Sequence, residues 1–385
     1  MMGKRHFVMA AGGTGGHMVP AHALAEELMA RGHQVSLITD ERGAKIPALF
    51  GNVEVNILPA GRLAGGVLGW LKAGRNILAG RAQARRFYRE VRPAAVVGFG
   101  GYPALPALLA AQGAGIATII HEQNAVLGRV NRLLARKVNA IATAYPQVDR
   151  LPKASAKKVE LVGNPVRDEV LSLRDRPFPK PEAEFNVLVT GGSQGATVLS
   201  SVVPDGLALL PEPYRNRLNI VQQCRAEDID RVRARYAELG LKAELATYLA
   251  DMPERLASAH LVIARAGAST IAELTAAGRP AILVPLPIAT DDHQTANARE
   301  MAKEGGARMV PQSEFTPERL AQEIATLGLE PDALAEAAAH ARACGRPDAT
   351  RALADLVERI SRTPGMDPLP AKEQPVAAPV QGALA

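Results

Sequence analysis

The stretch VMAAGGTGGHM at residues 8–18 places a glycine-rich turn directly behind an apolar run, and VLVTGGSQGAT at residues 187–197 repeats this arrangement in the second half of the chain. Glycine lets the backbone approach a ligand closely, and the amides that open a following helix attract anions. Each turn is therefore a candidate phosphate cradle. Two such turns on one chain predict two facing nucleotide-binding folds with a cleft between them.

Short apolar runs alternate with helical patterns around both turns, as parallel sheets require. A helix is expected from about Val19 to Arg31, closed by Gly32. In the first half, the predicted strands are Phe7–Ala11, Gln34–Thr39, Val53–Leu58, Ala94–Phe99, Ala117–His121 and Ala140–Ala144. In the second half, they are Phe185–Thr190, Leu218–Gln223, Ala243–Thr247, His260–Ala264 and Ala281–Pro285. The sequence therefore predicts an α/β protein with two Rossmann-like, doubly wound domains.

The length of 385 residues, with 47% apolar side chains, exceeds what one core usually holds and supports two domains. The proline-rich, charged stretch Arg174–Pro181 is predicted to link them. We expect an N-terminal domain over residues 1–170 and a C-terminal domain over residues 171–346, with a helix near 347–362 as a candidate to pack back on the first domain. Residues 363–385 lack periodicity, which predicts a disordered tail.

The composition restricts the partners and the compartment of the chain. The net charge of +6 favours anionic partners, whereas an aromatic content of 4% offers no stacking platform for nucleic acid. Cys224 and Cys344 are the only cysteines, so we expect neither a disulfide framework nor a zinc cluster, and a reducing, cytoplasmic compartment is favoured. The sequence contains no apolar run of membrane-spanning length.

The first glycine turn, taken alone, also fits a dinucleotide-binding dehydrogenase. Gly13 and Gly15 follow a strand, and Asp40 or Glu41 ends the next one, where a ribose ligand is expected. Against NAD, Met18 occupies the place of the third glycine, and the second turn is left unexplained. The glycines also have a purely structural interpretation as tight strand-to-helix turns.

Short motifs are spread along the whole chain: Gly12–His17, Gly98–Tyr102, His121–Asn124, Gly163–Arg167, Gly191–Ala196, Arg265–Glu273 and His293–Ala298. In this order they resemble the MurG family of lipid-intermediate glycosyltransferases, over roughly Lys4 to Ile360. The resemblance implies a GT-B fold and the inverting transfer of N-acetylglucosamine from UDP-N-acetylglucosamine. The implied acceptor is the 4-hydroxyl of N-acetylmuramoyl-pentapeptide on undecaprenyl diphosphate, in peptidoglycan synthesis at the cytoplasmic face of the membrane. No cofactor is implied.

The same resemblance assigns the donor mainly to the second domain. It implies that Ser193 and its neighbouring amides contact the diphosphate, Glu273 the ribose hydroxyls and Leu249 the uracil. A carboxylate accepts two hydrogen bonds from a cis-diol, which suits Glu273 to this role. Asn124 and Gln294 resemble the family's sugar-contacting amides. The other predicted binding residues are Arg167, the helix start Ala268, Ser269 and Thr270, and the first turn Thr14, Gly15 and Gly16, whose amides also suit the lipid diphosphate.

An inverting transfer needs a base for the acceptor hydroxyl and a counter-charge for the leaving diphosphate. His17 is the first candidate base because its pKa lies near neutrality, and its alternative role is to orient the glycine loop. Glu122 is the rival base or the orienter of His17. Arg167 is expected to supply the counter-charge, which makes a metal unnecessary, and Asp228–Asp230 is interpreted as a solvated helix face. His293 stands where some relatives have a second glutamine, and its role is open.

Residues 62–92 hold eight basic side chains against one acid, Glu90, with Leu63, Val67, Leu68, Trp70 and Leu71 interleaved. This composition fits a surface that docks on anionic lipid. It fits equally well an amphipathic helix whose leucines face the core. The family resemblance favours docking, and therefore a peripheral membrane protein.

Three other functions stay open at the level of sequence. Another GT-B enzyme would transfer a UDP-sugar to a different lipid, such as diacylglycerol. An NAD-dependent oxidoreductase would bind a nicotinamide nucleotide at Gly13 and Asp40. A nucleotide-sugar-binding scaffold would bind the donor without turnover.

Overall fold

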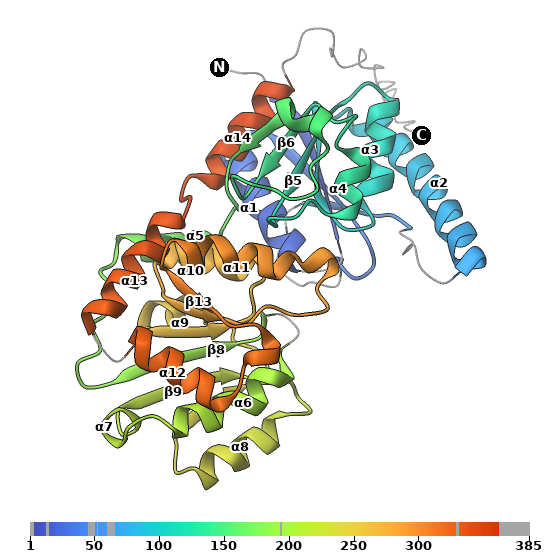
Figure 1. Cartoon of the computed structure of the whole chain (residues 1–385). Coiled ribbons are helices and arrows are strands. Elements are labelled where there is room, and N and C mark those ends of the chain that lie inside the picture. The colour runs from blue at the N-terminus through green and yellow to red at the C-terminus, as the bar shows by residue number, and fades with distance from the viewer. Residues whose placement is uncertain are drawn as a thin grey trace, which may run out of the picture.

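The computed structural model describes residues 4–12, 15–44, 51, 53–59, 66–192, 195–328 and 331–361. Two fully parallel sheets, each with helices against it, make up the molecule (Figure 1). The predicted α/β architecture of two doubly wound units is confirmed. The predicted tail at residues 363–385 lies outside the described residues.

The first sheet has the strand order β3-β2-β1-β4-β5-β6-β7. Its strands are β1 (His6–Ala11), β2 (Gln34–Thr39), β3 (Glu54–Ile57), β4 (Ala95–Gly100), β5 (Ala117–Glu122), β6 (Ala140–Thr143) and β7 (Val159–Leu161). The second sheet has the order β10-β9-β8-β11-β12-β13. Its strands are β8 (Phe185–Thr190), β9 (Leu218–Gln223), β10 (Ala243–Ala246), β11 (Leu261–Ala264), β12 (Ala281–Leu283) and β13 (Ala307–Met309).

Helices connect the strands in both units. Those associated with the first sheet are α1 (Gly15–Ala30), α2 (Gly66–Val91), α3 (Ala104–Gly113), α4 (Arg129–Leu134) and α14 (Ala349–Ile360), with the 3₁₀ helix η1 (Lys153–Lys158). Those associated with the second sheet are α5 (Asp168–Leu171), α6 (Thr197–Ala208), α7 (Glu212–Arg215), α8 (Ile229–Glu238), α9 (Met252–Ser258), α10 (Ala268–Ala277), α11 (His293–Lys303), α12 (Pro317–Gly328) and α13 (Pro331–Cys344), with η2 (Ser172–Asp175), η4 (Thr290–Asp292) and η5 (Gln312–Glu314).

The strand order reverses between β1 and β4 in the first sheet and between β8 and β11 in the second. Ligands of open α/β sheets bind at such reversal points, outside the carboxyl ends of the strands. Both glycine-rich turns follow a strand at a reversal point, since one follows β1 and the other follows β8. The fold therefore places both predicted cradles where a ligand is expected.

The two short strands β7 and β13 were not predicted from the sequence. Each has only three residues and includes a charged one, Glu160 or Arg308, so neither forms an apolar run. They lie at the outer edge of their sheets, where a neighbour on one side is enough. The predicted helix at Val19 also begins earlier, at Gly15, because the glycines that close the turn already belong to α1.

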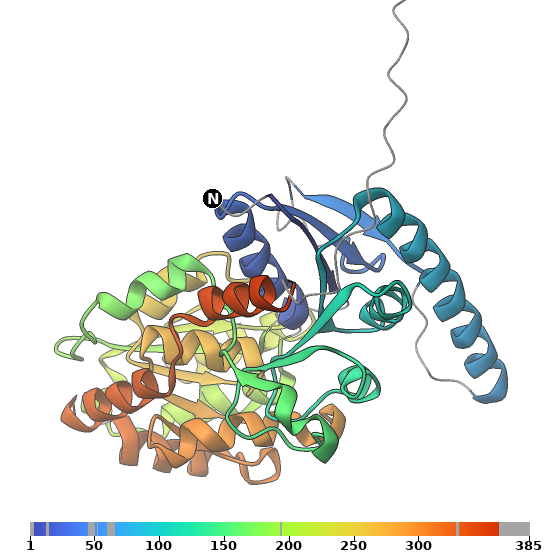
Figure 2. The same ribbon diagram turned by 90° about the horizontal axis from the view of Figure 1, so that it is seen from above.

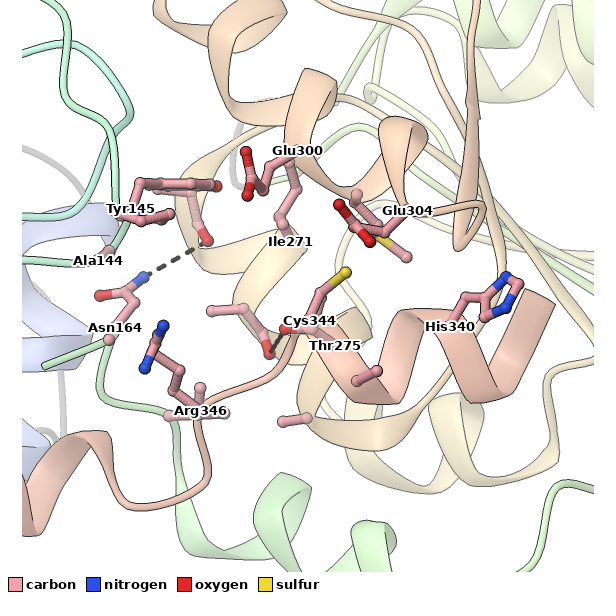
Figure 3. A pocket seen from close by; sticks show the side chains of 18 residues that line it. Ala144, Tyr145, Asn164, Ile271, Thr275, Glu300, Glu304, His340, Cys344 and Arg346 are labelled. Atoms are coloured by element: carbon pink, nitrogen blue, oxygen red, sulfur yellow. Dashed lines mark hydrogen bonds between the residues drawn. The ribbon is translucent and has the colours of Figure 1, made fainter. Parts of the chain in front are cut away.

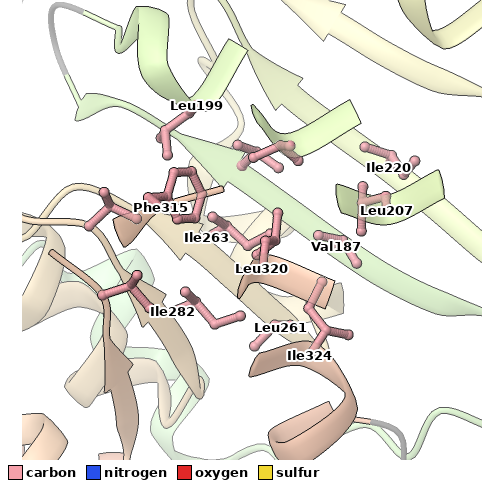
Figure 4. Close-up of a cluster of buried hydrophobic side chains, with 14 of the residues drawn as sticks. Val187, Leu199, Leu207, Ile220, Leu261, Ile263, Ile282, Phe315, Leu320 and Ile324 are labelled. Carbon is pink, nitrogen blue, oxygen red and sulfur yellow. The ribbon is translucent and has the colours of Figure 1, made fainter. Parts of the chain in front are cut away.

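Each sheet is buried on both faces by apolar side chains that alternate along its strands. Figure 4 shows one face of the second sheet, where side chains of α6 and α12 pack on it. The labelled residues of this cluster are Val187, Leu199, Leu207, Ile220, Leu261, Ile263, Ile282, Phe315, Leu320 and Ile324. Burial on both faces explains the nearly continuous apolar runs of the central strands.

The chain crosses from the first sheet to the second between Leu161 and Asp168, earlier than the predicted linker Arg174–Pro181. Val170 and Leu173 explain the difference, because both are buried in the core of the second unit. The first residues of the predicted linker belong to η2, and the stretch from Arg176 onward has no regular structure.

The chain returns to the first unit after α13, and α14 packs beside α1 (Figures 1 and 2). Leu353, Leu356 and Val357 of α14 are buried in the core of the first sheet. A hydrogen bond between His33 and Glu358 at 2.7 Å and an ion pair from Arg31 to Glu358 at 3.0 Å close the contact. The C-terminal helix thus completes the first unit. The domain limits at residues 170 and 346 stay predictions.

Candidate active site

The two units meet where α10 and α11 of the second face the first (Figure 1). On the first unit, the β1–α1 turn and the β4–α3 turn pack backbone to backbone. A Cβ atom on Gly101, whose φ is +77°, would lie 2.6 Å from the carbonyl oxygen of Gly12. Only glycine permits this contact, which ties two predicted motifs into one surface.

His17 lies in the first turn of α1, directly behind the glycine turn. Its Nδ1 is 2.9 Å from the carbonyl oxygen of Gly12. A carbonyl only accepts hydrogen bonds, so Nδ1 carries the proton and the neutral ring keeps its lone pair on Nε2. Desolvation is the main cause that lowers the pKa of His17, while the Gly12 carbonyl and the charge of Glu122 raise it. His17 is therefore neutral near pH 7, with a basic Nε2.

Glu122 ends β5 and is buried, with 2% of its surface exposed. Its Oε1 accepts hydrogen bonds from the backbone N–H and the side-chain amide of Asn124, both at 3.1 Å. Its Oε2 accepts from Gly128 N at 2.8 Å and from Asn131 Nδ2 at 2.9 Å. Both oxygens thus hold the loop after β5. Neither oxygen is hydrogen-bonded to His17, because the Nδ1 of His17 binds the carbonyl of Gly12 instead.

Asn124 connects the two units instead of pointing free into the junction. Its Oδ1 accepts a hydrogen bond from Asn297 Nδ2 of α11 at 3.0 Å. Asn297 is fully buried, and its Oδ1 accepts from Ala125 N at 2.8 Å while its Nδ2 also donates to the carbonyl of Ala266 at 3.2 Å. The predicted sugar-contacting amide is therefore engaged with the second unit. Asn297 belongs to the motif His293–Ala298 but was not predicted to be a site residue.

Arg167 and Glu273, both predicted to bind donor, bind each other. Their closest atoms, Nη2 and Oε1, are 3.1 Å apart. Burial raises the pKa of Glu273, and the charge and hydrogen bond of Arg167 act in the opposite direction. The pair joins the crossing segment to α10, and neither side chain is fully exposed.

The helix start predicted at Ala268, Ser269 and Thr270 is the first turn of α10. Gly267 caps it with an extended backbone conformation and without a side-chain hydrogen bond. The free amides of a first helical turn carry a positive end, which suits a diphosphate. Ser269 Oγ is buried and has no hydrogen-bond partner among the described residues.

Gln294 in the first turn of α11 has a defined orientation. Its Oε1 accepts hydrogen bonds from Ala266 N at 3.2 Å and Leu286 N at 3.0 Å, which leaves its amide N–H groups as donors. Leu249 is buried in the core of the second unit, beside the exposed Tyr248.

The remaining predicted residues belong to the glycine turns. Gly15 and Gly16 open α1, and a Cβ atom on Gly15 would meet nothing within 4 Å. Thr14 and Ser193 lie outside the described residues. The roles predicted for these glycine turns therefore stay predictions.

Two ion pairs of Asp291, which the sequence did not predict, join the units beside His293. Asp291 in η4 lies 2.7 Å from Arg132 and 2.6 Å from Arg150, both of the first unit. Asp291 has a φ of +58°, in a region that costs energy for a residue with a side chain. His293 Nδ1 pairs with the carbonyl of Thr290 at 2.8 Å. Asp291 is 159 residues from Arg132 and 141 residues from Arg150 in sequence, so no local pattern predicts these ion pairs.

Two carboxylates considered from the sequence have other partners. The carboxylate of Asp40 accepts hydrogen bonds from Gly43 N at 2.9 Å and from Arg42 at 3.0 Å. Residues of the same turn therefore already bind the carboxylate that the ribose of NAD would need. Asp228 is buried, so the prediction of a solvated face is wrong for it. It binds Arg231 at 2.9 Å at the start of α8, whereas Asp230 is exposed as expected. Among the described residues, no group of three or more His, Cys, Asp or Glu could hold a metal ion.

Two Rossmann-like sheets that face each other, with glycine turns at both reversal points, define the GT-B class of glycosyltransferases. The glycosyltransferase family 28 N-terminal domain matches residues 7–143, and the glycosyltransferase family 28 C-terminal domain matches residues 186–360. The chain belongs to glycosyltransferase family 28. It is a hexosyltransferase, and the resemblance to the MurG family is confirmed.

Relatives match the chain over nearly its whole length. A Zymomonas mobilis protein named UDP-N-acetylglucosamine--N-acetylmuramyl-(pentapeptide) pyrophosphoryl-undecaprenol N-acetylglucosamine transferase is 62% identical over 362 residues, which cover 94% of each chain. A Caulobacter vibrioides protein of the same name is 49% identical over 92% of this chain and 99% of its own. The crystal structure of Acinetobacter baumannii MurG matches with a TM-score of 0.74 at 35% identity, over 93% of this chain and all of that one.

Proposed function

We propose that this enzyme transfers N-acetylglucosamine from UDP-N-acetylglucosamine to the 4-hydroxyl of N-acetylmuramoyl-pentapeptide on undecaprenyl diphosphate. This is the reaction named for its full-length relatives, and it belongs to peptidoglycan synthesis. The observation that carries the mechanism is the orientation of His17. Its Nδ1 is bound to Gly12, which leaves a basic Nε2 in the first turn of α1, the helix that contacts α10 of the second unit.

In the proposed step, His17 Nε2 takes the proton of the 4-hydroxyl while its oxygen attacks the anomeric carbon. The bond from that carbon to the diphosphate breaks on the opposite face, which inverts the configuration, and UDP leaves with the electron pair. The imidazolium that forms is stabilised by the Gly12 carbonyl and by the charge of Glu122, both of which favour the protonated ring. Glu122 acts here as a buried support of the β5 loop rather than as the base.

Donor binding is proposed to separate Arg167 from Glu273. The guanidinium then neutralises charge on the departing diphosphate, together with the amides of the first turn of α10. The carboxylate is released to accept hydrogen bonds from the ribose hydroxyls. Because Arg167 and the helix start supply positive charge at the diphosphate, no metal ion is required in this scheme.

Membrane docking is proposed for the first turns of α2. The second half of this helix is anchored, since Ala84, Phe87 and Tyr88 are buried against the first unit. The first half projects away from the sheet (Figures 1 and 2), and Leu78 is 66% exposed. The side chains of residues 66–68 and 70–72, and residues 62–65, lie outside the description. No helix in the described ranges is both long and apolar enough to cross a bilayer, so docking would be peripheral.

A radiolabel assay tests the reaction. Purified enzyme should transfer labelled N-acetylglucosamine to the undecaprenyl-linked acceptor and not to diacylglycerol. Transfer to diacylglycerol alone would indicate the other lipid glycosyltransferase, and donor binding without transfer would indicate a scaffold.

The variant His17→Ala tests the base. It should lower turnover by about 10²-fold or more with donor affinity nearly unchanged, because proton transfer is lost and the donor contacts are kept. His22→Ala is the matched control, since His22 lies further along the same helix, outside the glycine turn, and pairs with the exposed Glu26 at 3.4 Å. Normal turnover in His17→Ala would remove His17 from the mechanism.

A further inference from the structure

A cavity of about 300 Å³ lies behind α10, at the hinge between the two units (Figure 3). Ala268, Ile271, Ala272, Thr275 and Ala276 of α10 line it. Residues three and four apart share one face of a helix, so this face is opposite to the one that carries Glu273. The cavity therefore lies on the side of α10 that faces away from Glu273, and it shares only Ala268 with the helix start that is proposed to bind the diphosphate.

Both chain segments that cross between the units contribute to this hinge cavity. Gly163, Asn164 and Val166 come from the first crossing, and Arg346 from the second. The crossings touch, since a Cβ atom on Gly163 would lie 2.8 Å from Cβ of Arg346. A rotation of one unit against the other must therefore change the shape of the cavity.

The polar side of the cavity is negative. Glu300 of α11 is half-buried and forms no ion pair or side-chain hydrogen bond with the described residues. Glu304, one turn further, has Lys303 at 3.9 Å, and both are exposed. Figure 3 shows Tyr145 pointing toward Glu300. Arg346 also lines the cavity, but its side chain is exposed and, among the described residues, it forms no ion pair with Glu300.

The thiol and the phenol in the cavity are neutral. Burial, followed by the charges of Glu304 and Glu300, raises the pKa of Cys344. Burial, followed by the charge of Glu300, raises the pKa of Tyr145. Among the half-buried lining residues, Glu300 therefore carries the charge, and no ion pair with a described residue neutralises it.

We propose that the hinge cavity binds an organic monocation, with its ammonium on Glu300 and its apolar body against Ile271, Ala272 and Met301. A cavity of roughly 150 Å³ accommodates benzene, so the volume of about 300 Å³ suits a bicyclic body. Ligand sites of this kind are mostly apolar, with a few placed polar groups. The half-buried, unpaired carboxylate selects the charge of the ligand.

Isothermal titration of the full chain with tryptamine tests the site. Tryptamine should bind one molecule per chain, whereas indole-3-propionate, which has a similar body and a negative charge, should not bind. Neutral 3-methylindole should bind roughly tenfold more weakly than tryptamine or worse, because a charge-assisted hydrogen bond is lost. Equal binding of all three compounds, or no saturable binding of tryptamine, would overturn the proposal.

Variants locate the bound molecule. Glu300→Gln should weaken tryptamine binding about tenfold, and Ala343→Trp should abolish it by filling the space from an exposed position of α13. Glu336→Gln, on the exposed side of α13, is the control for loss of one negative charge and should bind as the unmodified chain does. Unchanged binding in both cavity variants would refute the location. Unfolding midpoints confirm that each variant is folded.

Protection of Cys344 gives an independent readout. Cys224 is buried and Cys344 lines the cavity, so N-ethylmaleimide should modify Cys344 first. Saturating tryptamine should slow this modification severalfold, as measured by mass spectrometry of the peptides. An unchanged rate of modification would contradict binding in the cavity.

Linkage to the donor rests on the proposed function, because it assumes UDP contacts on α10. Saturating tryptamine should change the Kd of UDP without displacing it, and UDP should change the Kd of tryptamine by the same factor. An unchanged Kd refutes the linkage, and mutual exclusion would place tryptamine in the donor site and refute the cavity. Since tryptamine binding is measured directly, its failure is distinguishable from failure of the transfer reaction.

Discussion

The substitution Glu122→Gln separates a structural carboxylate from a catalytic base. Each oxygen of Glu122 accepts two hydrogen bonds, from Asn124 on one side and from Gly128 and Asn131 on the other. Glutamine replaces one oxygen with an NH₂ group, which then faces two N–H donors. Whichever way the amide turns, two hydrogen bonds are lost at a buried position.

The magnitude follows from these lost contacts. A hydrogen bond to a charged group contributes about 1.5 to 3 kcal/mol, so two of them amount to about 3 to 6 kcal/mol. A unit of this size loses about 2 to 4 °C of melting temperature per kcal/mol, which predicts a decrease of about 6 to 24 °C. Because the loop after β5 carries Asn124 and Ala125, which bind Asn297, contact between the two units should weaken as well.

Thermal and urea unfolding, followed by circular dichroism, measure this loss. Glu41→Gln, at an exposed position after β2, is the control for charge and should change stability by less than about 0.5 kcal/mol. Turnover is then measured well below the melting temperature of each variant. A Glu122→Gln protein with the unfolding midpoint of the unmodified chain and a turnover lowered by about 10²-fold would show that Glu122 is the base and that our reasoning is wrong.

Three further substitutions test the site. Asp291→Asn should open the junction, because it removes the ion pairs of Asp291 with Arg132 and with Arg150, which contribute about 1 kcal/mol each at this exposure. A larger radius of gyration in X-ray scattering checks this, and identical scattering contradicts it. His293→Gln should move the acidic limb of the kcat/KM profile to higher pH, because the charge of His293 helps to lower the pKa of His17 and the base must be neutral to act; a profile from about pH 5 to 8 measures the shift, and an unmoved limb excludes the influence. Glu273→Ala should weaken UDP binding by roughly tenfold, through loss of the ribose hydrogen bonds; an unchanged Kd in calorimetry rules out that contact.

Much of the fold was predictable because parallel strands leave a local signal. β2, β8 and β9 begin and end at the predicted residues, because strands of a sheet with two buried faces carry apolar residues on both sides, although polar residues interrupt each run. β7 and β13 escaped prediction for the same reason, because short edge strands need no such run. Asp228 was misjudged because charge in a helical pattern suggests exposure, whereas its burial depends on what α8 packs against.

The order of motifs along the chain was enough to recognise the family, the GT-B fold and the class of reaction. Glycine turns behind apolar runs are local features, and their chemistry depends on neighbouring residues alone. The site residues are a different matter. The contacts of Asn124 with Asn297, of Arg167 with Glu273 and of Asp291 with its two arginines join residues that are far apart in the sequence. They form only because the two sheets pack together.

The hinge cavity likewise exists only in the assembled molecule, since both crossings and α10, α11 and α13 border it. Periodicity reports which face of one element is buried, and it contains no information about which distant side chain lies opposite. Local patterns in the chain therefore established the architecture and the reaction class. The packing of the two units decided which charges are paired, which amides are engaged, and where a carboxylate with no ion pair among the described residues lines a cavity.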